Sequence, residues 1–335
     1  MQHKILKFRD TAIVSAASVV GDKEYRGPLG ACFDLHDSTD RFGMKSWEKA
    51  ESEMQRLALN VALGKISASE RDVDALFAGD LLNQCVGSSY GLLDFDIPYF
   101  GLYGACSTAI EGLMLCGMMC SAGYFSTCAA VTSSHYCSAE RQYRTPLEYG
   151  AQRSPTAQWT VTGSGAFLVR RGGSRIRLLE ALPGIVREKG INDASNMGAA
   201  MAPAAADTIL RYFRYSDQRP EDFDKIITGD LGFEGGSILC ELLLAEGLDI
   251  RKQYDDCGMM IYDAARQDMH AGGSGCGCSA VVLASHLCPK ISRGELRNVL
   301  VIGTGAMMSP ASLQQGEAIP AVAHLIQISY DENAE

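Results

Sequence analysis

An internal duplication constrains the fold of this chain of 335 residues more than any other feature of its sequence. Residues 72–81 are echoed 150 positions later by residues 222–231, and each segment is an apolar run followed by Gly-Asp. A second echo pairs residues 106–134 with residues 278–306, at an offset of 172 and without a gap. One Gly-Asp turn after an apolar run is common, but two echoes in the same order predict two similar units.

Each unit shows an alternation of helix and strand patterns. Ser46 is a suitable N-cap for a helix whose apolar residues recur at helical spacing: Ala50, Met54, Leu57 and Val61. The short apolar run 75–78 then predicts a buried strand that ends in a tight turn. Because this order recurs along the chain, the sequence predicts an α/β fold.

The segment from Cys106 to Cys120 is apolar on almost every face except at Glu111, which is typical of a helix in a protein interior. The duplication supplies a second such segment after Cys278. We expect the two helices to pack against each other between two sheets, with a ligand site where the halves meet.

Composition excludes several classes of function. The 47% of hydrophobic residues supports a large core, and the 12 cysteines lie in apolar segments rather than polar loops, which predicts reduced thiols. A net charge of −10 without a Lys/Arg cluster argues against binding nucleic acid or anionic lipid. We recognise neither a secretory signal nor a membrane-spanning segment, so membrane association would require a protein partner.

Cys106 begins the first apolar helix, directly after the strand-like residues 99–102. Free amide groups and the helix dipole at such a position stabilise a thiolate or a bound anion. The position therefore suits a nucleophile or a carboxylate-binding site, and inert packing is the alternative.

Polar residues cluster after the next apolar run. His135 follows residues 129–131 at the carboxyl end of a predicted strand, where α/β sites usually lie, although a solvated loop is the alternative. The segment 140–149 contains Arg141, Tyr143 and Arg144. Guanidinium groups suit carboxylates and tyrosines suit a flat aromatic ligand, whereas a loop with surface salt bridges is the plainer interpretation.

Two glycine-rich segments let the backbone approach a ligand closely, or form ordinary turns: residues 162–165, with Thr162 and Ser164, and residues 272–278. The second segment is neither a dinucleotide fingerprint nor, with CxC alone, a zinc site. Asp80 and Asp230 occupy equivalent turns of the two units. Together they could hold calcium with ligand oxygens, and helix capping is the alternative.

The segment 104–108 in a duplicated α/β chain resembles the thiolase superfamily, which includes beta-ketoacyl synthase III. Along nearly the whole chain the sequence resembles more closely the stage V sporulation protein AD family. The matching motifs are AGDLLNQ at 78–84, GACST at 104–108, TSSH at 132–135, AERQ at 139–142, VTGSG at 161–165, MAPAAADT at 201–208 and GGSGC at 272–276.

This resemblance implies a thiolase-like fold with pseudo-twofold symmetry, five αβαβα layers and two βαβαβαββ-type halves, 1–172 and 173–335. It also implies a homodimer that acts in endospore formation. Such a protein would bind dipicolinic acid, as its calcium complex, for uptake into the developing spore, without catalysis. It would be a soluble protein of cytoplasmic type at the inner membrane of the forespore, beside membrane proteins of the same operon.

We expect the ligand site to be formed by ten residues: Asp80, Asn83, Cys106, His135, Arg141, Tyr143, Arg144, Thr162, Ser164 and Asp230. No cofactor is expected besides calcium bound with the ligand, at Asp80 and Asp230.

The departures from condensing enzymes argue against catalysis. Those enzymes pair the cysteine with a histidine and a second histidine or asparagine. This chain has Asp230 and the segment 272–275 at the corresponding places, and a carboxylate raises a neighbouring thiol's pKa. His270 keeps open an alternative, an acyltransferase that uses Cys106. A scaffold for a membrane channel is a third possibility, and residues 22–41 are either a partner-docking loop or a dimer arm.

Overall fold

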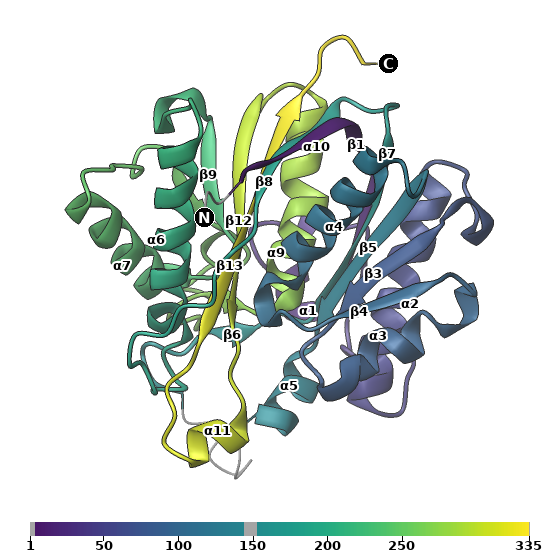
Figure 1. The fold of residues 1–335 in the computed structure, drawn as a ribbon. Helices are drawn as coiled ribbons and strands as arrows, with labels where there is room; N and C mark the ends of the chain where they lie inside the picture. The colour runs from purple at the N-terminus through teal and green to yellow at the C-terminus, as the bar shows by residue number, and fades with distance from the viewer. Residues whose placement is uncertain (1–3, 144–152, 335) are drawn as a thin grey trace.

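The computed structural model describes residues 4–143 and 153–334. Two five-stranded halves of one hydrogen-bonded sheet form its framework (Figure 1). The N-terminal half contributes, in the order β4-β3-β5-β7-β1, the strands β1 (Leu6–Gly21), β3 (Ala75–Gly79), β4 (Tyr99–Leu102), β5 (Thr127–Ser134) and β7 (Gly163–Arg171). The C-terminal half contributes, in the order β10-β9-β12-β13-β8, the strands β8 (Ile176–Leu182), β9 (Lys225–Thr228), β10 (Tyr254–Asp256), β12 (Asn298–Ala306) and β13 (Ala321–Tyr330).

The same strand order in both halves confirms the expected pseudo-twofold arrangement. The halves are not separate sheets, however, because β1 and β8 pair antiparallel and join all these strands into one hydrogen-bonded set. The boundary expected between residues 172 and 173 falls between β7 and β8. The proposed division into two domains stays a prediction.

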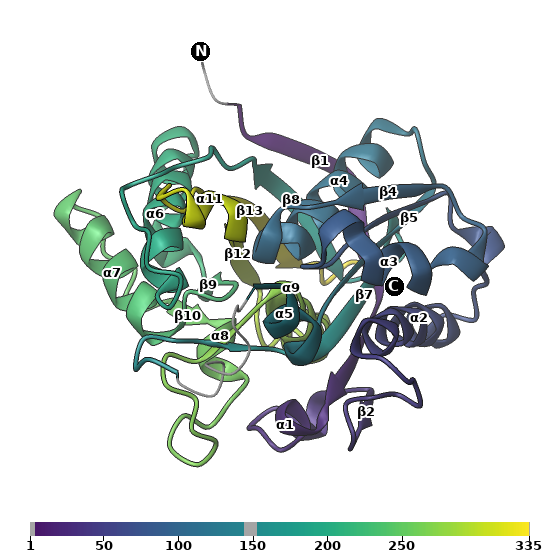
Figure 2. The same cartoon turned by 90° about the horizontal axis from the view of Figure 1, so that it is seen from below.

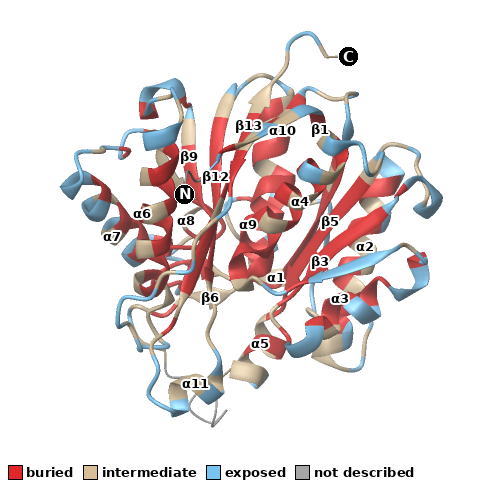
Figure 3. Cartoon of the chain, in the orientation of Figure 1, coloured by how far each residue is buried: buried red, intermediate tan, exposed pale blue. Residues whose placement is uncertain are grey.

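Helices and sheets stack in five layers, as the resemblance implied. The outer helices are α2 (Trp47–Lys65) and α3 (Val86–Gly91) on the N-terminal side, and α6 (Met197–Tyr215) and α7 (Gly232–Ala245) on the C-terminal side. Between the sheets lie α4 (Thr108–Ala122) and α9 (Cys276–Val282). One hydrophobic cluster fills the central layer and two others lie beneath the outer helices, so burial is concentrated along the sheets (Figure 3).

Helix α2 begins where the sequence predicts, because the Ser46 hydroxyl accepts a hydrogen bond from the Lys49 amide at 3.3 Å. Its fully buried stripe differs slightly from the predicted one. Ala58 and Leu59 are fully buried, whereas Leu57 and Val61 are only half-buried.

The structure corrects the register of the second echo. Ala105 and Gly275, which precede the two central helices, both have positive φ and lie 170 residues apart. The glycines that end these helices, Gly123 and Gly294, lie 171 residues apart. The extra residue is taken up by the π-helical turn Leu283–Leu287 that follows α9, because such a turn is wider than an α-helical one. Cys106 therefore corresponds to Cys276 rather than Cys278.

One helical segment among the described residues, Ala105–Ala122, is long and apolar enough by composition to cross a membrane. No membrane-spanning segment was expected from the sequence. In this fold the segment packs between the two sheets, where apolar residues on nearly every face are expected.

The short elements surround this framework (Figure 2). Residues 22–41, whose role the sequence leaves open, form α1 (Asp22–Tyr25) and β2 (Leu35–Asp37), which pairs parallel with β1. Whether they dock a partner or a second copy stays open. The other short elements are α5 (Tyr136–Tyr143), β6 (Trp159–Thr160), α8 (Cys257–Met260), β11 (Gly273–Ser274) and α11 (Pro310–Gln314). Helix α10 (Cys288–Ser292) instead continues α9 beyond the π-helical turn, in the central layer.

Candidate functional site

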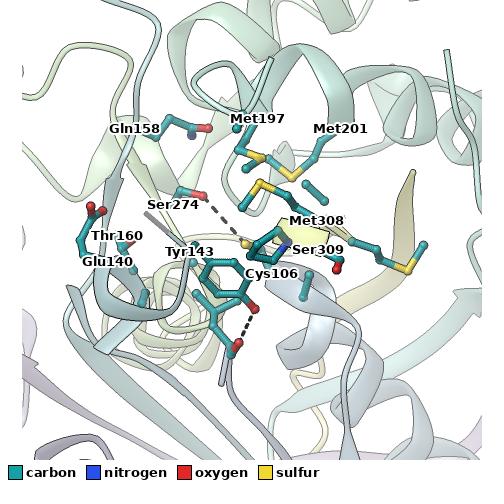
Figure 4. Close-up of a pocket in the computed structure, with 18 of the residues that line it drawn as sticks. Cys106, Glu140, Tyr143, Gln158, Thr160, Met197, Met201, Ser274, Met308 and Ser309 are labelled. Carbon is teal, nitrogen blue, oxygen red and sulfur yellow. Dashed lines mark hydrogen bonds between the residues drawn. The ribbon is translucent and has the colours of Figure 1, made fainter. Parts of the chain in front are cut away.

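A cavity of about 690 Å³ opens where the two halves meet, as the duplication predicted. Its walls come from α5, the start of α6, the segment from β12 to α11 and the small parallel ribbon of β6 and β11. The side chains of Cys106 and Ser274 lie close together in it (Figure 4).

Cys106 lies in a 3₁₀ turn, Ala105–Ser107, between β4 and α4. Ala105 holds a positive φ of 51°, which is uncommon for a residue with a side chain and turns the chain sharply before the cysteine. The Cys106 thiol lies 3.8 Å from the Ser274 hydroxyl. The expected position at the start of a buried helix is confirmed.

Asp230 lies behind Ser274. Its Oδ2 accepts hydrogen bonds from the Ser274 hydroxyl at 2.7 Å and the Gly275 amide at 3.0 Å, and its Oδ1 accepts one from the Thr304 hydroxyl at 2.7 Å. Gln158 supports the same corner, because its side-chain amide donates to the backbone carbonyls of Asp230 and Gly273.

The electrostatics of this corner oppose a thiolate. Burial, and then the charge of Asp230, raise the pKa of Cys106 well above its usual value, while burial also raises the pKa of Asp230. For the thiol, desolvation and the acidic neighbour outweigh the helix dipole, and whether the helix start binds an anion stays a prediction. The carboxylate has the effect that the sequence comparison with condensing enzymes predicted.

Neither candidate histidine lines the cavity. His135 is buried in the fold, with Nε2 donating to the Asp40 carbonyl at 2.8 Å and Nδ1 accepting from the Cys137 amide. His270 contacts the Ser154 carbonyl and lies 3.2 Å from an Asp268 carboxylate oxygen. The structure thus places both imidazoles in contacts that support the fold.

Residues near the end of α5 lie partly at the surface and partly at the cavity. Arg141 is exposed and pairs with Glu48 at 3.0 Å, so its guanidinium does not line the cavity. Tyr143 does line it, and its hydroxyl donates to the Leu81 carbonyl. Arg144 lies outside the described residues.

Asn83 also lines the cavity, and its side-chain oxygen accepts a hydrogen bond from the Tyr103 hydroxyl at 3.1 Å. Thr162 and Ser164 do not. Thr162 accepts from the Tyr136 amide, and Ser164 is fully buried within β7. The close backbone approach predicted at 162–165 is real, but it serves helix packing: a Cβ at Gly165 would meet the Ala280 backbone at 2.7 Å.

Asp80 and Asp230 do not fit a shared calcium ion. Asp80 accepts from the Leu82 amide and from both the amide and hydroxyl of Ser88, so its oxygens, like those of Asp230, already face donors. No group of three or more His, Cys, Asp or Glu side chains within 4–143 and 153–334 is arranged to hold a metal ion. The alternative role of helix capping fits Asp80, because it accepts hydrogen bonds from Ser88 in the first turn of α3.

Sequence reasoning missed much of the lining. Met197, Met201, Met307 and Met308 form one wall, and Ser274 and Gln158 lie beside the cysteine. The adjacent pair Met307-Met308, directly after the echoed segment 278–306, was the available signal. Single polar residues such as Gln158 carry no sequence pattern that would mark them as part of the site.

Fold and site together define a thiolase-like protein with a buried cysteine beside an acidic residue where its two halves meet. The fold matches 3-oxoacyl-(acyl carrier protein) synthase III from Xanthomonas oryzae, with a TM-score of 0.62, 14% identity and coverage of 97% of this chain and 100% of that one. It also matches cerulenin-bound OleA from Xanthomonas campestris, with a TM-score of 0.63, 14% identity and coverage of 98% and 99%.

The sequence relationship is more specific. The family model of stage V sporulation protein AD matches residues 2–329. Stage V sporulation protein AD of Bacillus subtilis is 44% identical over 310 residues, which cover 92% of this chain and 91% of that protein. The chain belongs to the stage V sporulation protein AD family.

Proposed function

We propose that this protein binds dipicolinic acid, as its calcium complex, in the cavity beside Cys106 and serves its uptake into the developing spore without catalysis. The observation that carries the proposal is a large cavity lined by Cys106, whose thiol pKa is raised well above its usual value by burial and then by the charge of Asp230. A nucleophile in this state lacks the activation that condensing enzymes need. The family's place in sporulation supplies the biological setting.

Aromatic and neutral polar groups support a flat ligand. Tyr143 and Tyr103 both line the cavity, and their hydroxyls lie 3.4 Å apart. The Asn83 side-chain amide and the Thr160 hydroxyl lie in the same lining and can donate to carboxylate oxygens.

The charge of the lining favours the calcium complex over the free dianion. No Lys, Arg or His is among the lining residues that the structure describes, whereas Glu140 is. Burying two carboxylates without a cationic partner costs free energy, and a calcium ion carried by the ligand offsets that charge. Calcium would therefore enter as cargo, held by the dipicolinate rather than by Asp80 and Asp230.

Isothermal titration with dipicolinate, with and without calcium, tests this function. We expect saturable binding that is tighter with calcium, and a loss of about tenfold in Tyr143→Ala because the aromatic contact disappears. Tyr124→Ala is the matched control, since Tyr124 is 78% exposed and remote from the lining. Arg141→Ala should bind as the unaltered protein does. No binding to any form would reject the function and favour a scaffold.

The remaining expectations about assembly belong to the same proposal. Strand β4 is an edge of the sheet, and it exposes Phe100 and Tyr99 to solvent. We propose that this edge pairs two copies in a homodimer. Membrane proteins of the same operon would then hold the dimer at the inner membrane of the forespore. Light scattering that gives the mass of one chain at micromolar concentration would contradict the dimer.

A further inference from the structure

The cavity is much larger than one flat aromatic acid requires. It measures about 690 Å³, whereas a closed cavity of about 150 Å³ accommodates a benzene ring. Well-formed ligand sites bury most of their ligand's surface. One dipicolinate against Tyr143 would leave a large part of this cavity unfilled.

The unfilled part is bounded by a distinct surface, which we call the methionine wall: Met197, Met201, Met307 and Met308. Met197 and Met201 lie one helical turn apart at the start of α6, and Met307 and Met308 directly follow β12. Figure 4 shows the side chains of Met197, Met201 and Met308 gathered together, away from Tyr143. Two regions far apart in the sequence thus supply one thioether surface.

The chemistry of this wall suits an aromatic ring. Thioether sulfur is polarizable and makes favourable contacts with ring edges, and unbranched methionine side chains adapt to the shape of what they cover. Polar groups border the wall as well. The Ser309 hydroxyl lines the cavity, and α6 begins there with its amide-bearing end, which favours a carboxylate.

We propose that the methionine wall is a second aromatic subsite, so that each chain binds two aromatic carboxylates, one at Tyr143 and one at the wall. This inference rests on the proposed function and extends it from one ligand to two. The two subsites differ in chemistry: tyrosine rings and the Asn83 amide bound the first, and thioethers bound the second.

Equilibrium dialysis against calcium dipicolinate measures the number of ligands bound per chain at saturation. We expect two for the unaltered protein and one for Met308→Trp, because the indole fills the second subsite. Met308→Leu keeps the volume and removes the sulfur, so it should retain two sites and weaken one by about two- to tenfold. Met118→Leu, at an exposed position of α4 that is not part of the lining, is the matched control.

The possible outcomes distinguish a failure of the second subsite from a failure of the proposed function. One ligand per unaltered chain, weakened in Tyr143→Ala and unaffected in Met308→Trp, would overturn the second subsite and leave the proposed function intact. No bound ligand would overturn both. An acyl thioester that binds beside a single dipicolinate, and is excluded by Met308→Trp, would assign the wall to an apolar chain and overturn the inference.

Discussion

The turns at Asp80 and Asp230 are equivalent in the two halves, yet their carboxylates serve different parts of the molecule. Asp80 accepts from Leu82 and Ser88, within its own segment. Asp230 accepts from Ser274, Gly275 and Thr304, which lie far away in the sequence. The same turn therefore makes local hydrogen bonds in one half and hydrogen bonds to distant segments in the other. Of the two carboxylates, that of Asp230 is the one that lies near Cys106.

The central cysteines diverge in the same way. Cys106 lines the cavity, whereas its counterpart Cys276 is fully buried and donates to the Ala105 carbonyl at 3.0 Å. The C-terminal cysteine thus supports the turn that positions the N-terminal one. One half presents the thiol and the other half controls its surroundings.

The first test of this comparison is the stability of Asp80→Ala and Asp230→Ala. Each change leaves several buried donors without an acceptor, so we expect each to lower the free energy of unfolding by about 3 kcal/mol. Denaturant unfolding monitored by circular dichroism measures the loss. Asp249→Ala, at an exposed ion pair, should leave the midpoint unchanged. A much smaller loss in only one of the two buried variants would show that the turns differ in stability as well as in use.

The second test concerns Glu51, a buried acid beside the N-terminal turn at Asp80. Burial, and then the charge of Asp80, raise the pKa of Glu51 to about 8, although Ser138 and Ser133 donate to its oxygens. Since its pKa is higher in the folded than in the unfolded chain, its contribution to stability is complete below about pH 4.5 and is lost as the pH rises through about 8.

We therefore expect stability to fall by roughly 1 to 3 kcal/mol over that range, and Glu51→Gln to reduce the fall. Burial raises the pKa values of Glu24 and Asp256 to about 7, so part of the fall in stability should remain in Glu51→Gln. Thermal unfolding between pH 5 and 9 measures the profile. Glu53→Gln, on the same helix and paired with Arg56, is the control. An unchanged profile in Glu51→Gln would mean that Glu51 is ionised in the fold.

The smallest expected effect is on the reactivity of Cys106. Removing the charge of Asp230 in Asp230→Asn should lower the thiol's pKa and speed alkylation by iodoacetamide about tenfold at pH 8, which corresponds to one pKa unit. Asp80→Asn should change nothing. Mass spectrometry of the peptide that contains Cys106 measures the rate. Rapid labelling of the unaltered protein, blocked by an acyl thioester, would instead favour the acyltransferase alternative.

Patterns carried by contiguous segments were predictable. The cap at Ser46, the strand at 75–79 and the helix after Cys106 all depend on local spacing, and the structure has each of them. The echoes predicted pseudo-symmetry, but the predicted offset was two residues too long at the start of the central helices and one residue too long at their ends. The change between the two ends comes from the π-helical turn, which leaves no clear mark in an apolar run.

Of the residues chosen from the sequence for their chemistry, only some also lie at the cavity. Cys106, Asn83 and Tyr143 line the cavity, and Asp230 lies behind it. Arg141 faces Glu48 instead, because side-chain direction at the surface depends on which partner lies nearby. His135 and His270 were likewise chosen for their chemistry, and their hydrogen bonds are satisfied within the fold.

The sequence by itself determined the layered α/β architecture, the duplication and the family, because apolar spacing and motifs are properties of short segments. Only the tertiary structure decided what surrounds Cys106. Ser274, Asp230 and the methionine wall come from segments more than 90 residues away from it, and their approach depends on how the two halves pack. The state of the thiol is set by burial and neighbouring charge, and neither quantity exists until the chain has folded.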